Sequence, residues 1–562
     1  MCFPCNNNEE VGFFIMLNIN ERFVDDVFDE NGVLKSYKFK YESNFNFAYD
    51  VVDEIAKGEP DRPALLWCNP KGEEHLFTYG DLKYYSDKTA NMLRAKGIGK
   101  GDMVMVILKR HYQFWFTILA LHKLGAVCIP ASFLLTKHDI VYRVNSADIK
   151  AVLCTGDGET AAHVDDALPE CPSLKVRVMV NGSREGWDDF MTDMEKADAE
   201  FERVETNVEE PSIMYFSSGT TGNPKMAMHN YLYALGHLST AKYWHKVVPD
   251  GRHLTIADTG WGKAVWGKLY GQMFMETCVF VYDFDKFEAK DILQKIQDYK
   301  ITTLCCPPTM FRFFLQEDVA SYDLSNLEYC TIAGEALNPD VFNNWYKQTG
   351  IKLMEGFGQT ETTLTIANLL GTEPKPGSMG KPVMQYDVDI VDEDGNSVPP
   401  GVTGEIIIRT KEKPIGLFMG YYRDEEKTKA TWHDDVYHTG DTAWKDEDGY
   451  FWYVGRTDDV IKSSGYRIGP FEIESVLTEH PSVLECAVTG VPDPLRGNVV
   501  KATIVLKPGY EGTDELKKEL QQYVKKETAP YKYPRIVEFV DALPKTVNGK
   551  IRRSEIRKSD NA

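Results

Sequence analysis

The segment 215–226, which reads YFSSGTTGNPKM, concentrates hydroxyl side chains, two glycines and a lysine in one short loop. Gly219 and Gly222 allow the backbone to approach a ligand and to turn its N–H groups toward an anion, and Lys225 adds a positive charge. A Walker A loop has four residues between its glycines, whereas two separate these. The pattern predicts a loop that wraps a polyphosphate, although this composition after a strand can also form an ordinary turn. The predicted phosphate contacts are Ser217, Ser218, Gly219, Thr220, Thr221, Gly222, Asn223, Pro224 and Lys225.

Five further segments stand out downstream of this loop. They are AGEAL (333–337), EGFGQTE (355–361), YHTGD (437–441), GRTDDVIKSSGYRIGP (455–470) and PKTVNGKIRR (544–553). Their order and spacing resemble the adenylate-forming superfamily of acyl-CoA synthetases, luciferases and peptide-synthetase adenylation domains, over essentially the whole chain. The stretches KSSGYRIGPFEIES, GVPDPLRGNVVKATIVL and TAPYKYPR are similar to medium-chain acyl-CoA synthetases and their archaeal relatives. Each motif alone is a weak signal, but six in this order are not expected by chance.

The resemblance implies that a carboxylic acid is activated in two steps. Attachment of AMP, with release of pyrophosphate, gives the acid a good leaving group, which the thiol of CoA then displaces. Two anions meet at the α-phosphorus in the first step, so its transition state needs positive charge and oriented donors more than a base. By resemblance, Lys550 bridges the carboxylate and the α-phosphate. Without the resemblance, a lysine beside Arg552 and Arg553 would be interpreted as a solvated tail residue.

Thr360 and Glu361 resemble the family's α-phosphate contact and its magnesium ligand. One carboxylate together with phosphate oxygens suits Mg²⁺, which keeps most of its waters. Taken alone, Glu361 would be interpreted as a charge near a helix N-terminus. The expected catalytic residues are therefore Lys550, Thr360 and Glu361, and Glu361 is the expected metal ligand.

The resemblance places the adenosine of ATP in a slot between AGEAL and EGFGQTE, where Phe357 offers a face for stacking; a buried aromatic beside glycine is otherwise usually core. Asp441 is expected to accept hydrogen bonds from both ribose hydroxyls, with Arg456 beside the same sugar. An aspartate in a TGD sequence can also form an Asx turn. Beyond the phosphate loop, the residues assigned to ATP or AMP are Gly334, Glu335, Ala336, Glu355, Gly356, Phe357, Gly358, Gln359, Thr360, Asp441, Arg456, Arg467 and Lys550.

The second step needs other groups around the same acyl adenylate, and a small domain on a pivot can supply them. Asp458 matches the family's hinge, and Gly465 leaves room for the pantetheine thiol. No dedicated base is assigned, because a thiol of pKa about 8.5 attacks a reactive adenylate. The residues that the resemblance assigns to CoA are Ser464, Gly465, Tyr466, Arg496, Lys525, Tyr533, Pro534 and Arg535.

The acyl pocket is expected between the phosphate loop and EGFGQTE. Trp261, Gly262 and Trp266 are its predicted lining residues, and Trp244 precedes them. Large rings shorten a pocket, which favours a small, branched, medium-chain or aromatic acid over a long fatty acid. A tryptophan in this region can as well belong to the core. Lys263 leaves the chemistry of the acid's tail open.

These motifs require an α/β scaffold, and the apolar periodicity predicts one. Up to about residue 350, short apolar runs alternate with amphipathic segments, as in a doubly wound α/β domain. A period-two pattern over 383–410 predicts a β subdomain. The remainder predicts a small, mobile α+β domain, joined without a flexible linker. The expected domains are 1–456, of which 1–15 is a possible extension before Met16, and 457–562.

Composition narrows the functional classes. The chain has 562 residues and a net charge of −22, which disfavours nucleic acid and anionic membranes as partners. No apolar run approaches the roughly 20 residues that span a bilayer. The eleven cysteines are typical of reduced interior residues, and a zinc site at Cys2 and Cys5 is disfavoured. Because the N-terminal segment lacks the basic n-region of a signal peptide and the arginines of a transit peptide, the expected location is the cytoplasm.

The sequence therefore predicts an AMP-forming acid:CoA ligase that uses ATP, Mg²⁺ and CoA, acts on a small-molecule carboxylic acid and possibly forms a homo-oligomer. Two other functions stay open. The first is an adenylation enzyme that loads a carrier-protein thiol, although no carrier domain follows Ala562 and the basic residues assigned to CoA favour the free thiol. The second is a non-catalytic nucleotide-binding sensor, which the presence of Lys550, Thr360 and Glu361 disfavours. Luciferase-type oxidation has no support in the sequence.

Overall fold

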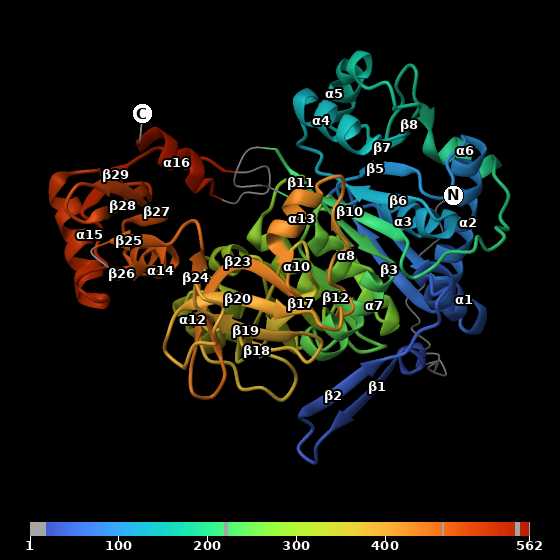
Figure 1. The fold of residues 1–562 in the computed structure, drawn as a ribbon. Coiled ribbons are helices and arrows are strands. Elements are labelled where there is room, and N and C mark those ends of the chain that lie inside the picture. The colour runs from blue at the N-terminus through green and yellow to red at the C-terminus, as the bar shows by residue number, and fades with distance from the viewer. Residues whose placement is uncertain (1–17, 218–222, 464–465, 546–550, 561–562) are drawn as a thin grey trace.

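The computed structural model describes residues 18–217, 223–463, 466–545 and 551–560 (Figure 1). Several residues predicted from the sequence lie outside these ranges, so the structure has no bearing on their contacts. They are Ser218, Gly219, Thr220, Thr221, Gly222, Ser464, Gly465 and Lys550, together with Cys2, Cys5 and Met16.

The first large sheet has eight strands in the order β21-β11-β10-β6-β5-β7-β8-β9. Its central strands run parallel, as expected where short buried strands alternate with helices. Its strands are β5 (Met103–Ile107), β6 (Val127–Pro130), β7 (Ala151–Thr155), β8 (Val176–Val180), β9 (Asp188–Asp189), β10 (Pro211–Ser217), β11 (Lys225–Asn230) and β21 (Gly420–Tyr421). The helices of this part are α1 (Glu54–Gly58), α2 (Tyr79–Ala95), α3 (Gln113–Leu124), α4 (Lys137–Ala147), α5 (Thr160–Ala167), α6 (Phe190–Lys196) and α7 (Leu232–Ser239).

The second large sheet has nine strands in the order β18-β17-β16-β15-β14-β12-β13-β3-β4. They are β3 (Pro63–Cys68), β4 (Glu74–Thr78), β12 (Arg252–Thr255), β13 (Cys278–Tyr282), β14 (Thr303–Cys305), β15 (Tyr329–Ile332), β16 (Leu353–Gly358), β17 (Leu364–Ala367) and β18 (Lys381–Pro382). The helices of this part are α8 (Gly262–Lys268), α9 (Tyr270–Phe274), α10 (Ala289–Asp298), α11 (Pro308–Phe314) and α12 (Pro339–Thr349).

Alternation along the strands organises these two sheets into five layers. Val104 and Val106 of β5 join a core between the sheets, whereas Met103 and Met105 of the same strand face the opposite side. Helices α2, α3, α7 and α9 fill the central core, α4 and α5 cover the outer face of the first sheet, and α10, α11 and α12 cover that of the second. The predicted doubly wound pattern is confirmed, and it is distributed over two sheets that share one helical layer.

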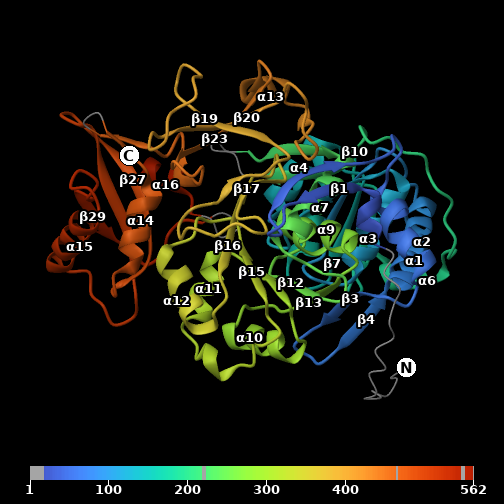
Figure 2. The ribbon, with the colours of Figure 1, turned by 90° about the horizontal axis from the view of Figure 1, so that it is seen from below.

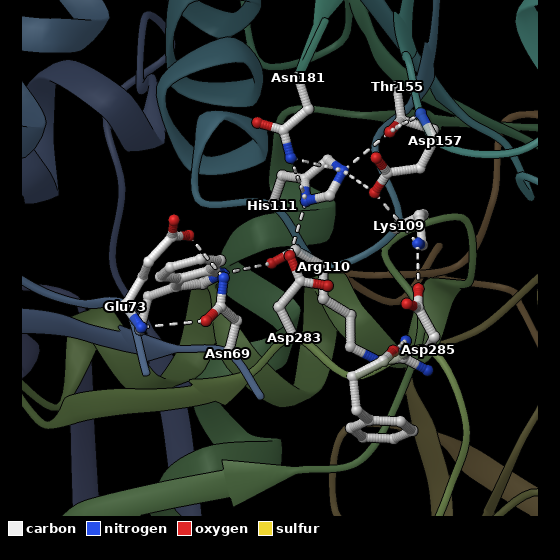
Figure 3. Close-up of polar contacts among 12 residues, drawn as sticks. Asn69, Glu73, Lys109, Arg110, His111, Thr155, Asp157, Asn181, Asp283 and Asp285 are labelled. Carbon is white, nitrogen blue, oxygen red and sulfur yellow. Dashed lines mark hydrogen bonds and ion pairs between the residues drawn. The ribbon is translucent and has the colours of Figure 1, made fainter. Parts of the chain in front are cut away.

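A buried polar junction ties the two sheets together near the ends of β5, β7 and β13 (Figure 3). His111 follows β5, and its Nδ1 lies 2.6 Å from Oδ2 of Asp283, which follows β13. On the other side, Nε2 of His111 lies 2.8 Å from Oγ1 of Thr155 and 3.4 Å from Oδ2 of Asp157. Lys109 completes the junction by an ion pair with Asp157 at 3.2 Å.

The predicted β subdomain is a five-stranded antiparallel sheet. Its strands are β19 (Asp387–Val391), β20 (Gly404–Arg409), β22 (Trp432–His433), β23 (Val436–Lys445) and β24 (Phe451–Arg456), and α13 (Glu425–Thr431) lies in the connection before β22. At the N-terminus, β1 (Val24–Phe28) and β2 (Leu34–Phe39) form a separate hairpin.

The C-terminal part has its own core and stands beside the two large sheets (Figure 2). Its elements are β25 (Ile461–Ser463), β26 (Tyr466–Ile468), α14 (Pro470–Glu479), β27 (Val483–Asp493), β28 (Gly497–Leu506), α15 (Asp514–Glu527), β29 (Ile536–Phe539) and α16 (Arg553–Asp560). Asn338, which caps α12, reaches across and donates a hydrogen bond to the carbonyl of Ser475 at 3.2 Å. The mixture of strands and helices predicted for this part is confirmed.

Among the described residues, no helix has the length and apolar character needed to cross a membrane. The nine described cysteines are buried and form no disulfide, as their apolar surroundings predicted.

Candidate active site

A cavity of about 1190 Å³ lies between the two large sheets and the C-terminal part. The flanks of the phosphate loop, AGEAL and EGFGQTE line it together with Asp441 and Arg456. Its C-terminal wall includes Lys545 and Ile551, the residues on either side of 546–550. Motifs that are widely separated in the sequence therefore border one space.

The phosphate loop closes a β-hairpin. Strands β10 and β11 pair antiparallel with Ser217 opposite Lys225, so the strand predicted before the loop is confirmed. Ser217, Asn223, Pro224 and Lys225 all line the cavity. Burial lowers the pKa of Lys225, and the nearby carboxylate of Glu361 opposes that change. The Lys225 side chain therefore lines the cavity where β11 begins.

Thr360 and Glu361 follow β16 and are held by contacts from two other segments, 418–421 and β11. The hydroxyl of Tyr421 donates to Oε1 of Glu361 at 2.7 Å, and the N–H of Phe418 donates to the Glu361 carbonyl at 2.8 Å. The carbonyl of Thr360 accepts from Nε2 of His229 at 2.7 Å. The two residues predicted to contact phosphate and metal are therefore fixed before a ligand binds.

The donor set around Glu361 fits magnesium better than a transition metal. Within the described ranges, no group of three or more His, Cys, Asp or Glu side chains could hold a metal ion. Glu361 is only 8% exposed and offers hard oxygen donors at the cavity edge. A single carboxylate that shares an ion with phosphate oxygens is the arrangement that Mg²⁺ favours.

The predicted adenine slot is built on backbone positions. Gly334 has φ = +101°, a conformation that favours glycine, and Nζ of Lys263 donates to the neighbouring Ala333 carbonyl at 2.6 Å. Glu355 is buried, and its Oε1 accepts a hydrogen bond from the N–H of Leu337 at 3.2 Å. Burial raises the pKa of Glu355 to about 8.

Trp244 packs directly behind this slot. A Cβ atom on Gly356 would lie 2.6 Å from the Trp244 indole, so glycine is needed there. The indole N–H donates to the Met354 carbonyl at 3.1 Å, which makes Trp244 part of the core. The ring of Phe357 lies 6.2 Å from that of Tyr453, and both line the cavity.

Asp441, the predicted ribose acceptor, lies in a polar network. It accepts hydrogen bonds from the Gln359 amide and from the Tyr453 hydroxyl, the latter at 3.1 Å. Nη1 of Arg456 lies 3.6 Å from Asp441, and its Nε lies 3.6 Å from Asp458. Arg456 thus connects the predicted ribose acceptor with the predicted hinge residue.

Both flanks of the segment that carries Lys550 are anchored. Lys545 and Ile551 form an antiparallel bridge, and Nζ of Lys545 pairs with Glu485 at 2.7 Å. Arg553 donates hydrogen bonds from Nε and Nη2 to the Glu474 carboxylate of α14, the shortest at 2.6 Å. Lys550 itself lies outside the described residues.

The described residues assigned to CoA gather on the C-terminal part, away from the lining of the cavity. Tyr466 stacks on Tyr531 at 4.0 Å. Lys525 and Arg535 lie over the ring of Tyr533, at 4.7 and 4.9 Å from its centre. Arg496 and Arg535 are exposed, and Pro534 is buried. Arg467, which was assigned to ATP or AMP, lies in β26 opposite Lys462.

The residues predicted for the acyl pocket lie in different surroundings. Trp261 precedes α8 and lines the cavity. Trp266 packs in an aromatic cluster, 6.0 Å from Trp244 and 5.7 Å from His245. Neither Gly262 nor Trp266 is among the described residues that line the cavity, so their acyl contact stays a prediction.

The structure adds residues that the motifs did not mark. Tyr421 and Tyr453 contact the predicted site residues Glu361 and Asp441, and Glu474 contacts Arg553, three residues after Lys550. None of the three was selected as a site residue, because a tyrosine in a short strand and a glutamate in a helix carry no local sign of these partners. Tertiary packing brings them to the site.

Comparison with known families gives matches over most of the chain. Residues 52–422 match the family model described as AMP-binding enzyme, and residues 472–550 match that of the AMP-binding enzyme C-terminal domain. Acyl-coenzyme A synthetase ACSM3 of Mus musculus, named as mitochondrial, is 43% identical over 537 residues, which cover 94% of this chain and 92% of the relative. Acyl-coenzyme A synthetase ACSM5 of Homo sapiens, also named as mitochondrial, is 45% identical and covers 92% and 90%.

Solved structures with this fold include two aromatic-acid ligases. The anthranilate CoA ligase AuaEII in complex with anthranoyl-AMP has a TM-score of 0.85 at 27% identity, and the match covers 93% of this chain and 98% of that one. A benzoate CoA ligase from Burkholderia xenovorans has a TM-score of 0.80 at 26% identity and covers 91% and 100%. ATP-bound MatB from Rhodopseudomonas palustris has a TM-score of 0.79 at 25% identity and covers 91% and 99%. The predicted fold class is confirmed.

Proposed function

Because this chain belongs to the AMP-binding enzyme family, we propose that it is an acid:CoA ligase that activates a small, branched, medium-chain or aromatic carboxylic acid. The resemblance to the medium-chain acyl-CoA synthetases is confirmed by relatives 43% to 45% identical over most of the chain. The enzyme uses ATP, Mg²⁺ and CoA, and it releases pyrophosphate and then AMP. The observation that carries the proposal is that one cavity is bordered by the flanks of the phosphate loop, by AGEAL and EGFGQTE, and by Asp441 and Arg456.

In the first half-reaction, this chain's residues bind and orient two anions. Lys225 places a cation beside the phosphate loop, and Glu361 is positioned to hold Mg²⁺, which would neutralise phosphate charge. Asp441 would accept the ribose hydroxyls, and its contacts with Gln359 and Tyr453 orient its carboxylate. Lys550 would add the charge that bridges the acid and the α-phosphate.

The second half-reaction requires the C-terminal part, residues 457–562, to turn about Asp458. Two observations support such a motion. The described residues assigned to CoA, including Tyr466 and Arg535, do not line the cavity in this arrangement, whereas the flanks of Lys550 do. The change is therefore expected to withdraw the lysine segment and bring the CoA residues to the adenylate, by rotation about few backbone dihedrals.

The nature of the acid is supported by Trp261, whose large ring lines the cavity. A bulky wall shortens the space available to an acyl chain. The anthranilate and benzoate ligases, which share the fold, are named for aromatic acids, and a flat ring fits beside an indole. The cytoplasmic location stays a prediction, since the relatives are named as mitochondrial proteins. The homo-oligomeric state also stays a prediction.

A panel of carboxylic acids tests this proposal. The purified chain, ATP and Mg²⁺ would be incubated with acetate, 2-methylbutyrate, hexanoate, benzoate or palmitate, with and without CoA, and AMP and acyl-CoA would be measured. We expect CoA-dependent AMP release, highest for a branched, medium-chain or aromatic acid and lowest for palmitate.

Two results would contradict the proposal in different ways. Pyrophosphate release that is unaffected by CoA, with acyl transfer to a carrier-protein thiol, would favour the carrier-loading alternative. Binding of ATP without turnover of any acid would favour the sensor. A preference for palmitate would overturn only the assignment of the pocket.

A further inference from the structure

Tyr421 lies between two groups of the candidate active site. Its hydroxyl donates a hydrogen bond to Oε1 of Glu361 at 2.7 Å, and Nζ of Lys225 donates to the same hydroxyl at 3.4 Å. The Lys225 ammonium also lies 5.1 Å from the centre of the Tyr421 ring. One side chain therefore touches both the expected metal ligand and the lysine that follows the phosphate loop.

The backbone fixes the place of this tyrosine independently of any ligand. Strand β21 pairs Tyr421 with Ala227 of β11, and the Tyr421 N–H donates to Oγ1 of Thr428 at 2.9 Å. Gly420 has φ = +122°, and a Cβ there would lie 2.9 Å from the Thr428 side chain. With only 5% of Tyr421 exposed, the ring has little freedom to turn away from Glu361.

The tyrosine hydroxyl donates its hydrogen bond to a side chain that is itself buried, since Glu361 is 8% exposed. A protonated phenol next to a carboxylate forms a charge-assisted hydrogen bond, which is stronger than one between neutral groups. The bond therefore constrains the orientation of the Glu361 carboxylate.

A small second cavity, of about 80 Å³, borders the same group. Glu361 lines both this cavity and the large one, and polar side chains such as Gln359 and Thr431 form other parts of the small cavity's wall. This space is large enough for water, and Mg²⁺ retains several waters when it binds to one carboxylate. Lys225 and Arg456 line the small cavity too, so the hydrogen bond between Tyr421 and Glu361 lies beside a water-sized space that also holds positive charge.

We propose that Tyr421 is a positioning residue that orients the Glu361 carboxylate for Mg²⁺ and holds it at a set distance from Lys225. The proposal rests on the proposed function, because it takes Glu361 as the metal ligand. Tyr421 acts through these two side chains and contacts no reacting atom. Fixing the carboxylate in advance removes a rotational freedom that metal binding would otherwise have to restrict.

The test is a magnesium titration of ATP binding in the full chain, without acid or CoA. Tyr421→Phe removes the hydroxyl and keeps the ring. We expect the Mg²⁺ concentration for half-maximal ATP binding, followed by isothermal titration calorimetry, to rise about tenfold, the order expected for losing one hydrogen bond to a charged group. ATP binding in EDTA should change less than twofold.

Two further variants separate positioning from a general loss of structure. Tyr422→Phe alters the adjacent tyrosine, which contacts Arg423, and should leave the Mg²⁺ midpoint unchanged. In a Glu361→Gln background, adding Tyr421→Phe should produce no further shift, because the carboxylate that it orients is gone.

The outcomes are distinguishable from failure of the proposed function. If the unaltered chain binds ATP with a Mg²⁺ requirement and Tyr421→Phe has the same midpoint, the positioning role is wrong and the proposed function stands. If Tyr421→Phe weakens ATP binding equally with and without Mg²⁺, the role is structural and the proposal is overturned. If the unaltered chain shows no magnesium-dependent ATP binding, both fail.

Discussion

At the residue scale, the environment of a side chain decides which protonation state it brings to the site. Glu355 lies at the adenine slot and is 4% exposed. Its Oε2 has no hydrogen-bond partner among the described residues, and burial raises the pKa of its carboxyl group to about 8. At neutral pH this glutamate is therefore mainly a neutral acid.

We expect Glu355→Gln to change how stability depends on pH. The carboxyl group titrates near 4.5 when unfolded and near 8 when folded, so the wild-type protein loses stability relative to the variant as pH rises through this window. Thermal unfolding at half-unit steps from pH 5 to 9 measures the gap. Glu373→Gln, at an exposed carboxylate paired with Lys352, is the control. A gap that stays constant from pH 5 to 8 would argue against a buried neutral acid.

At the element scale, one short helix determines how the tail of the chain is held. Helix α16 begins at Arg553, which contacts Glu474 of α14 at 2.6 Å. One turn further, Arg557 pairs with Asp459, the residue after the predicted hinge. The segment with Lys550 therefore ends at a helix that is tied both to the C-terminal core and to the pivot.

Glu474→Gln is expected to slow adenylation more than thioester formation. The change removes the charge that holds Arg553 and leaves the side-chain volume, so it loosens the support of the lysine segment. Acid-dependent exchange of pyrophosphate into ATP should fall about tenfold, as for loss of a charged hydrogen bond. Conversion of supplied acyl adenylate to acyl-CoA should fall less than threefold.

The control for this prediction lies on α16, the helix that begins at Arg553. Glu555 pairs with Arg552 at 2.6 Å on the exposed surface, and Glu555→Gln should leave both half-reactions within twofold. Equal losses of both half-reactions in Glu474→Gln would instead indicate a general defect of the C-terminal part.

At the scale of the whole molecule, the two large sheets meet at the buried junction around His111 (Figure 3). Burial alone would lower the pKa of His111, but hydrogen bonds and charges from Asp157 and Asp283 outweigh it and raise the pKa to about 9. The same contacts lower the pKa of Asp157 to about 2. The histidine is thus a cation that holds together carboxylates from both sheets at neutral pH.

This junction predicts a loss of stability in mildly alkaline solution. A histidine with a raised folded pKa contributes its full stability below its unfolded value of about 6.5, and that contribution is lost as pH rises through about 9. His111→Asn should therefore lower the melting temperature more at pH 6 than at pH 9.5. His433→Asn, at an exposed histidine, should show no such difference. A loss that is the same at both pH values would show that His111 is not charged in the folded protein.

Much of the fold and part of the site followed from local patterns in the sequence. Alternating and helical periodicities predicted the α/β region before residue 350 and the β subdomain after it, because side-chain direction repeats every two residues in a strand and about every 3.6 in a helix. The order of short motifs indicated the family, the cosubstrates and residues such as Asp441 and Arg456, which the structure places around one cavity.

Contacts between distant segments were decided only by the tertiary structure. Tyr421 meets Glu361 across 60 residues, and His111 meets Asp283 across 172. Tertiary packing also decided two larger features. The strands divide into two sheets around a shared helical layer, and the described CoA residues lie apart from the cavity lining. A local pattern indicates which face of a strand is buried, but not which strand lies beside it. Strand order and register, which depend on packing throughout the molecule, determine these partners.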